Sequence, residues 1–132
     1  MKEVSSSLRK LLETLVQRAG SDLFLVVGLP PALRINGVVQ RLETNPLEDA
    51  DIEGAVLPVL SDNALEQYRK SGSADSSFRI EGVGRFRINL HRERGRPAAA
   101  LRALAARPPR FSEGKRTYPQ PRGADYEEDE LE

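Results

Sequence analysis

The residues with the clearest chemical potential in this 132-residue chain are arginines. Residues 79 to 122 hold twelve basic and three acidic side chains, and every basic residue from 79 to 102 is arginine. A planar guanidinium group binds phosphate or carboxylate in a bidentate manner that lysine does not match. The block therefore predicts an anion-binding surface; its members are Arg79, Arg85, Arg87, Arg92, Arg94, Arg96 and Arg102.

The net charge of the whole chain does not reveal this basic block. The formal net charge is zero, but residues 1–78 carry −3, residues 79–122 carry +9 and residues 123–132 carry −6. Such asymmetry favours anion binding, partner docking or an acidic tail. A solvated basic face, partly neutralised by the acidic end of the same chain, remains an alternative explanation.

Several other chemistries are excluded by composition. The chain has no cysteine, so disulfide scaffolds, thiolate metal sites and cysteine nucleophiles are ruled out. A single histidine, His91, cannot build a multi-histidine metal centre. The carboxylates of Asp49 and Asp51 fall at a predicted helix start, where solvation explains them. We expect no catalytic residue and no metal site.

A nucleotide-binding loop is also missing from these 132 residues. Phosphate-loop chemistry needs G-x-x-x-x-G-K-[ST], and the nearest segment, 112–117, lacks the first glycine and the hydroxyl. We therefore expect no cofactor bound by this chain alone. No apolar run reaches the roughly eighteen residues of a membrane span, and no signal core is present, which predicts a cytoplasmic protein without a membrane span.

Apolar spacing predicts the elements of the first half. Residues 8–19 carry the i, i+3, i+4, i+7 stripe of a helix, with Gly20 as its stop. The run 23–27 predicts a strand buried on both faces. Asn36-Gly37 supplies the two positive-φ residues of a type I′ turn and predicts a hairpin between 32–35 and 38–42.

The second half predicts two helices, 48–60 and 63–70, with Pro58 ending or bending the first, and then strands over 74–80 and 85–91. In the last strand Phe86 faces the core, whereas Arg85, Arg87, Asn89 and His91 face outward. We take Arg85, Asn89 and His91 as a potential anion-binding face. The segment 97–107 is helical by propensity alone.

The element order predicts one α+β domain, a mainly antiparallel sheet with helices on one face. It spans residues 1–106; residues 107–132, basic and then acidic, are too polar to order themselves and predict a disordered tail. The arginines also suit nonspecific nucleic-acid binding. Against that alternative, the arginine strand carries no aromatic side chain on its outward face for base stacking.

Two motifs resemble a known family. The run 20–37, GSDLFLVVGLPPALRING, resembles the "ASDLHL, GxPPxxRxxG" signature of pilus-retraction (twitching motility, PilT-like) ATPases. Residues 75–78 and 82–89, DSSF and GVGRFRIN, resemble that family's "DFSF, GVxRFRVN", and residues 98–105 align with its "aavlRxIP". The resemblance covers about residues 5–106, in order and with similar spacing.

This resemblance implies the PAS-like N-terminal domain of the type II/IV secretion ATPase superfamily, whose members form hexameric rings. It implies that Arg87 and Arg102 contact nucleotide phosphates, with ATP held at an interface with a motor domain. It also implies a strand, not a helix, over the Ala-rich segment, with Arg102 beside Ala98 and Ala100 on an open face. We follow the family over propensity there, because tertiary context overrides propensity.

The sequence also departs from the family. Phe24 replaces the usual histidine, and the motor-domain motifs are absent from the 132 residues. We therefore expect a non-catalytic module that docks on a pilus or secretion motor ATPase or self-associates. The alternative is the front part of a longer active ATPase, which the reading frame past Glu132 would decide; the unusual tail favours a stand-alone relative.

Overall fold

The computed structural model describes residues 4–104. It contains three α-helices, one short 3-10 helix and six strands: α1 (Ser6–Gln17), β1 (Asp22–Val26), β2 (Ala32–Ile35), β3 (Val38–Arg41), α2 (Asp49–Val56), η1 (Leu57–Val59), α3 (Asp62–Ser71), β4 (Ser73–Ile80), β5 (Gly84–Glu93) and β6 (Arg96–Ala103). The predicted tail, 107–132, lies outside the described residues.

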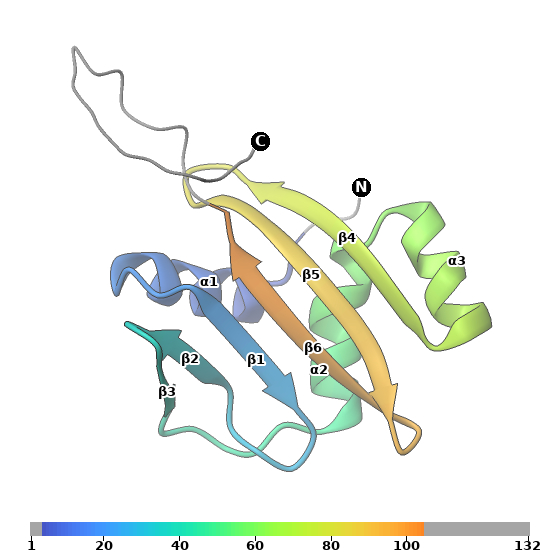
Figure 1. Ribbon diagram of the computed structural model, residues 1–132, viewed down its shortest axis with the longest axis horizontal. Helices are drawn as coiled ribbons and strands as arrows, with labels where there is room; N and C mark the ends of the chain where they lie inside the picture. The colour runs from blue at the N-terminus through green and yellow to red at the C-terminus, as the bar shows by residue number, and fades with distance from the viewer. Residues whose placement is uncertain (1–3, 105–132) are drawn as a thin grey trace.

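The strands form one antiparallel sheet in the order β3-β2-β1-β6-β5-β4. The helices lie on one side of this sheet, and no other described element covers its second side (Figure 1). The predicted α+β fold is thus confirmed. None of the helices in the described region is long and apolar enough to cross a bilayer.

The apolar core fills the space between the sheet and the helices. Leu8, Leu12 and Leu15, spaced for one face of α1, are completely buried. Full burial of one such side chain stabilises the fold by about 1.5–3 kcal/mol. The helix begins after Ser5, whose hydroxyl accepts a hydrogen bond from the amide of Leu8 at 3.2 Å.

Two turns decide where the first strands lie. Asn36 and Gly37 have φ of 52° and 79°, so the predicted I′ hairpin is confirmed. The residue that ends α1 in the left-handed region is Ala19 (φ 55°) rather than the expected Gly20. Gly20 has a different role, because a Cβ there would lie 3.0 Å from the carbonyl oxygen of Arg34 and closer still to Leu15.

The Ala-rich segment is strand β6, as the family resemblance implied and against its helical propensity. It lies at the centre of the sheet, between β1 and β5, so backbone hydrogen bonds on both of its edges outweigh the helical preference of alanine. Leu101 from this strand is fully buried, and Ala98 is nearly so.

Strand β1 differs from its prediction. We expected burial on both faces, but only Leu23 and Leu25 point into the core, whereas Phe24 and Val26 are half-buried on the side without helices. Because all residues of the run 23–27 are apolar, the sequence did not reveal that their burial alternates. The reason is that, within residues 4–104, no second layer of helices or strands covers this face.

Candidate functional site: an arginine-bearing sheet face

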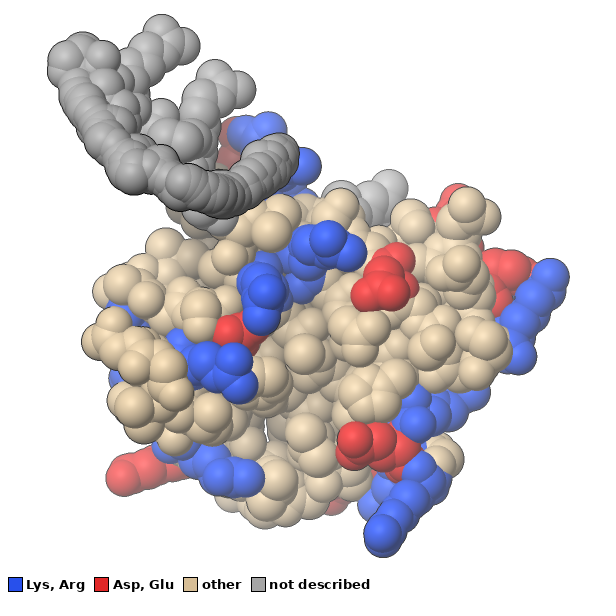
Figure 2. Space-filling view, viewed as in Figure 1, with Lys and Arg blue, Asp and Glu red and all other residues tan. Residues whose placement is uncertain are grey.

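The face of the sheet opposite the helices, here called the open face, carries the arginines. Its outward-pointing residues on the central strands are Asp22, Phe24 and Val26 on β1, Ala98, Ala100 and Arg102 on β6, and Arg85, Arg87, Asn89 and His91 on β5. Figure 2 looks onto this face and shows Lys and Arg side chains gathered on its upper part, around an acidic group.

One row of directly opposed residues crosses four neighbouring strands of the open face. From β2 to β5 the register places Arg34 beside Asp22, Asp22 beside Arg102, and Arg102 beside Arg87. Neighbouring strands lie about 4.8 Å apart. Three guanidinium groups therefore share a row with one carboxylate, and we call these four residues the arginine row.

Asp22 anchors this row. Its side chain is only 7% exposed, and its Oδ1 accepts a hydrogen bond from Nε of Arg102 at 3.2 Å. Nη1 of Arg34 lies 3.8 Å from Oδ2, which also accepts a hydrogen bond from the Ser21 hydroxyl at 2.7 Å. Burial alone would raise the pKa of Asp22, but these hydrogen bonds and positive charges outweigh it and lower the pKa below its ordinary 3.8.

Two arginine pairs stand directly opposite each other without an intervening carboxylate. Arg87 of β5 faces Arg102 of β6, and Arg85 of β5 faces Arg79 of β4. All four, here called the arginine cluster, are exposed. Among the described residues, Arg102 alone of the four has an ion-pair partner, Asp22. Like charges at opposed positions destabilise a sheet, so this arrangement favours a bound anion.

The three residues predicted as an anion-binding face lie on the same side of β5 but have different surroundings. Arg85 belongs to the arginine cluster. Asn89 donates a hydrogen bond to Asp75 at 3.0 Å, and Nε2 of His91 lies 3.4 Å from Glu93. At about 3.3 Å per residue, Arg85 and His91 are roughly 20 Å apart along the strand, too far for one small anion.

The rest of the predicted arginine block lies at the other end of the sheet. The guanidinium of Arg92 covers the ring of Tyr68 at 4.3 Å, and Arg96 approaches Asp49 at 3.9 Å. Arg94 occupies the turn between β5 and β6 with φ of 55°. The sequence block thus divides into the arginine cluster and a second group with mainly structural contacts.

Sequence reasoning missed Asp22, Arg34 and Phe24 as members of this surface. Phe24 lies on the open face, and the guanidinium of Arg34 sits 5.2 Å from its ring centroid. The face therefore does contain an aromatic group, contrary to what β5 alone indicated, but Arg34 covers it. Only the pairing register brings these residues together, although the alternation of β1 was available as a signal.

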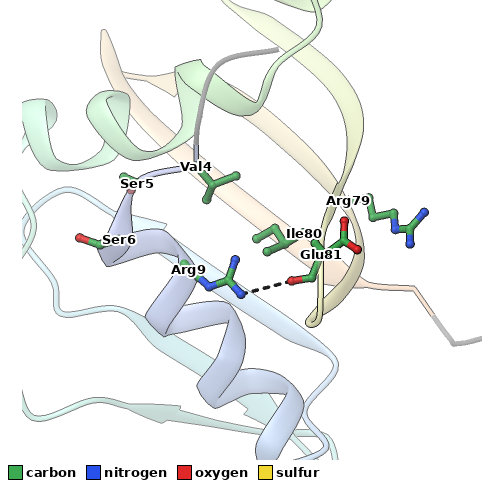
Figure 3. Close-up of a pocket in the computed structure, with 7 residues that line it drawn as sticks. All are labelled: Val4, Ser5, Ser6, Arg9, Arg79, Ile80 and Glu81. Atoms are coloured by element: carbon green, nitrogen blue, oxygen red, sulfur yellow. Dashed lines mark hydrogen bonds between the residues drawn. The ribbon is translucent and has the colours of Figure 1, made fainter.

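A shallow hollow lies between the start of α1 and the end of β4 (Figure 3). Val4 and Ile80 supply its apolar lining, and Arg79 points away from it. Arg9 is already engaged, since it donates to the carbonyl oxygen of Glu81 at 3.2 Å and to Glu13 at 3.0 Å. Across residues 4–104 no cluster of three His, Cys, Asp or Glu side chains forms a metal site.

Comparison with known proteins shows that the chain is similar to ATPases of type IV pili. The chain is 30% identical over 98 residues to the type IV pilus retraction ATPase PilT of Pseudomonas aeruginosa and 29% identical over 106 residues to its type IV pilus ATPase PilU. The chain is homologous to the N-terminal part of the PilT-type pilus-retraction ATPases. This confirms the resemblance. The matches cover 74% and 80% of the chain but 28% of each ATPase, so the chain spans less than a third of these relatives.

Solved structures agree. A crystal structure of the pilus retraction motor PilT with bound ADP superimposes with a TM-score of 0.72 and 33% identity, covering 83% of this chain and 32% of PilT. The Legionella pneumophila ATPase DotB, at 18% identity and a TM-score of 0.67, covers 85% of this chain and 32% of DotB and shows the shared fold. No protein-family model matches this PilT-like chain.

Proposed function

We propose that this chain is a non-catalytic assembly module of the PilT type, which docks on a pilus or secretion motor ATPase, or on a second copy of itself. Its relationship to PilT and PilU supports the choice of partner, and the absence of a phosphate-binding loop from its 132 residues supports the non-catalytic role. Such a module works in the cytoplasm, beside the motor.

The observation that carries the proposal is the opposition of Arg87 and Arg102 on the open face. The Cβ atoms of two directly opposed residues lie about 5 Å apart. The guanidinium groups of Arg87 and Arg102 therefore repel each other unless an anion bridges them. Each presents a planar fork that matches phosphate oxygens. We therefore assign Arg87 and Arg102 to the phosphates of a nucleotide held at the interface with the motor. The structure of PilT with bound ADP supports the choice of a nucleotide as the ligand.

Asp22 gives the two arginines different roles. It fixes Arg102 through a hydrogen bond at 3.2 Å, while Arg87 makes no ion pair with any residue in the described region. Arg102 is thus preorganised, which reduces the entropy lost on binding. Arg87 is the arginine that gains most from an incoming phosphate.

Binding of the purified chain to a PilT-type ATPase, with and without ADP, tests this function. We expect Arg87→Ala and Arg102→Ala each to weaken ADP-dependent binding by about tenfold, the usual loss for one hydrogen bond to a charged group. The control is Arg69→Ala, which removes the same charge from an exposed position on α3. Equal effects of all three substitutions would contradict the role of the two arginines, and a chain that neither binds the ATPase nor self-associates would contradict the docking role.

A further inference from the structure

In residues 4–104, the carboxylates near the arginine cluster leave three of its four arginines without an ion pair. Asp22 is already shared by Arg34 and Arg102, and the nearby Asp75 accepts a hydrogen bond from Asn89. Within the described residues, Arg79, Arg85 and Arg87 have no ion-pair partner. Strands β4, β5 and β6 fix these groups at spacings of about 5–7 Å, so one extended acidic segment meets several of them at once.

We propose that the acidic segment 125–132 of this chain docks on the arginine cluster and competes there with phosphate ligands. The segment, DYEEDELE, holds six carboxylates and no basic residue. Its charge complements the four arginines, and multiple carboxylate–guanidinium contacts give orientation as well as affinity. This inference rests on the proposed function, because it assigns regulation to the same surface.

The course of the chain places the segment within reach. Strand β6 ends at Ala103, one residue after Arg102, and the amide of Leu104 donates to the carbonyl oxygen of Arg85 at 2.9 Å. Twenty residues then separate Leu104 from Asp125. A linker of twenty residues allows a reach on the order of 25 Å, about the width of six strands at about 4.8 Å each.

Tethering makes a weak contact effective. A segment on a short linker meets its site at an effective concentration in the millimolar range. Exposed ion pairs contribute little one by one, so three or four of them yield a contact that a phosphate ligand can still displace. The segment therefore acts as a competitor that lowers the affinity for anions, and salt weakens it.

The test compares two matched variants of the full chain. Glu127→Gln/Glu128→Gln/Asp129→Asn removes three charges from the segment, and Glu43→Gln/Asp62→Asn/Glu66→Gln removes three exposed charges elsewhere by the same chemistry. Nitrogen-15 NMR follows the Nε–Hε signals of Arg87 and Arg102, with Arg69 as a reference. Inorganic tripolyphosphate serves as the anion probe in a parallel titration.

We expect the segment variant alone to shift the Arg87 and Arg102 signals, with the difference lost at about 1 M salt, where the Debye length is about 3 Å. Its tripolyphosphate affinity should rise at least threefold. Unchanged arginine signals would overturn the proposal, since the acids would then pair elsewhere. A signal difference that depends on protein concentration would also overturn it, because the contact would come from a second copy.

The two proposals fail separately. If the arginine signals shift but tripolyphosphate binds neither form, the segment docks while the phosphate site of the proposed function is wrong. If tripolyphosphate binds both forms equally and the arginine signals are unchanged, the phosphate site stands and the docking of 125–132 is wrong.

Discussion

Asp22 and Arg102 are separated by 80 positions in the sequence, yet they form the central ion pair of the open face, with Nε of Arg102 3.2 Å from Oδ1 of Asp22. Asp22 is also the one charged residue among those described that is buried. Its carboxylate organises the guanidinium groups on both sides of it. Several expected outcomes depend on this pair and on the surfaces around it.

Asp22→Asn should lower the free energy of unfolding by about 1–3 kcal/mol at pH 7, since it leaves Arg102 and Arg34 without their anion. The pKa of Asp22 is lower in the folded state than in the unfolded state, so its contribution is present above about pH 4. It is lost as the pH falls through the folded-state pKa.

Urea unfolding at pH 7 and at low pH measures this difference. The gap between the wild type and Asp22→Asn should shrink below about pH 4. Asp75→Asn, at an exposed position, serves as the control and should have a smaller effect. A gap that stays constant with pH would show that the charge of Asp22 is not what stabilises the fold.

In the variant Glu127→Gln/Glu128→Gln/Asp129→Asn, Arg87→Ala should stabilise the isolated protein by about 0.2–1 kcal/mol at low salt, because it removes a repulsion between opposed arginines that the acidic segment otherwise offsets. The same substitution should weaken phosphate binding. Urea unfolding should show the gain disappearing at about 1 M salt. Arg69→Ala lacks an opposed arginine and should not give this gain; a destabilised Arg87→Ala protein would contradict the expected repulsion.

Gly20→Ala should destabilise the protein by about 1–3 kcal/mol, because its new Cβ would crowd Leu15 and the backbone of Arg34. Gly54→Ala is the matched control within α2. No atom lies within 4 Å of a Cβ placed there, so helix propensity should make this change stabilising by up to about 1 kcal/mol. Thermal unfolding of the two variants should show shifts of opposite sign.

Phe86→Ala should lower the free energy of unfolding by about 3–5 kcal/mol. Phe86 is completely buried and packs on Phe78 with ring centroids 5.6 Å apart. Phe24→Ala, on the half-buried open face, should cost clearly less, because it loses mainly the contact with Arg34. Chemical denaturation measures the free energy of unfolding of the two variants. Equal losses would show that the open face is as enclosed as the core.

Local signals in the sequence were enough for much of the fold. The stripe of leucines in α1, the Asn36-Gly37 turn and the alternation around Phe86 each depend on neighbours a few residues away, so they predict elements without knowledge of the tertiary structure. Pro58 likewise marks the 3-10 turn that follows α2, close to where a bend was expected.

The site depends on distant pairing and was therefore harder to predict. Nothing local places Asp22 beside Arg102 or Arg34 over Phe24, because those contacts follow from the order β2-β1-β6. Propensity makes the Ala-rich segment a helix, and only hydrogen bonding to β1 and β5 reverses that preference. The family resemblance carried this information; residue patterns alone did not.

The position of β6 has a consequence for biosynthesis. Among the described residues, the strand at the centre of the sheet comes last, so β1 to β3 and β4 to β5 emerge from the ribosome before it as two separate halves. At about 5–20 residues per second, translation must reach Ala103 before the halves can join. A partner that needs both Arg87 and Arg102 therefore meets its complete surface only after β6 has paired, because Arg102 belongs to that strand.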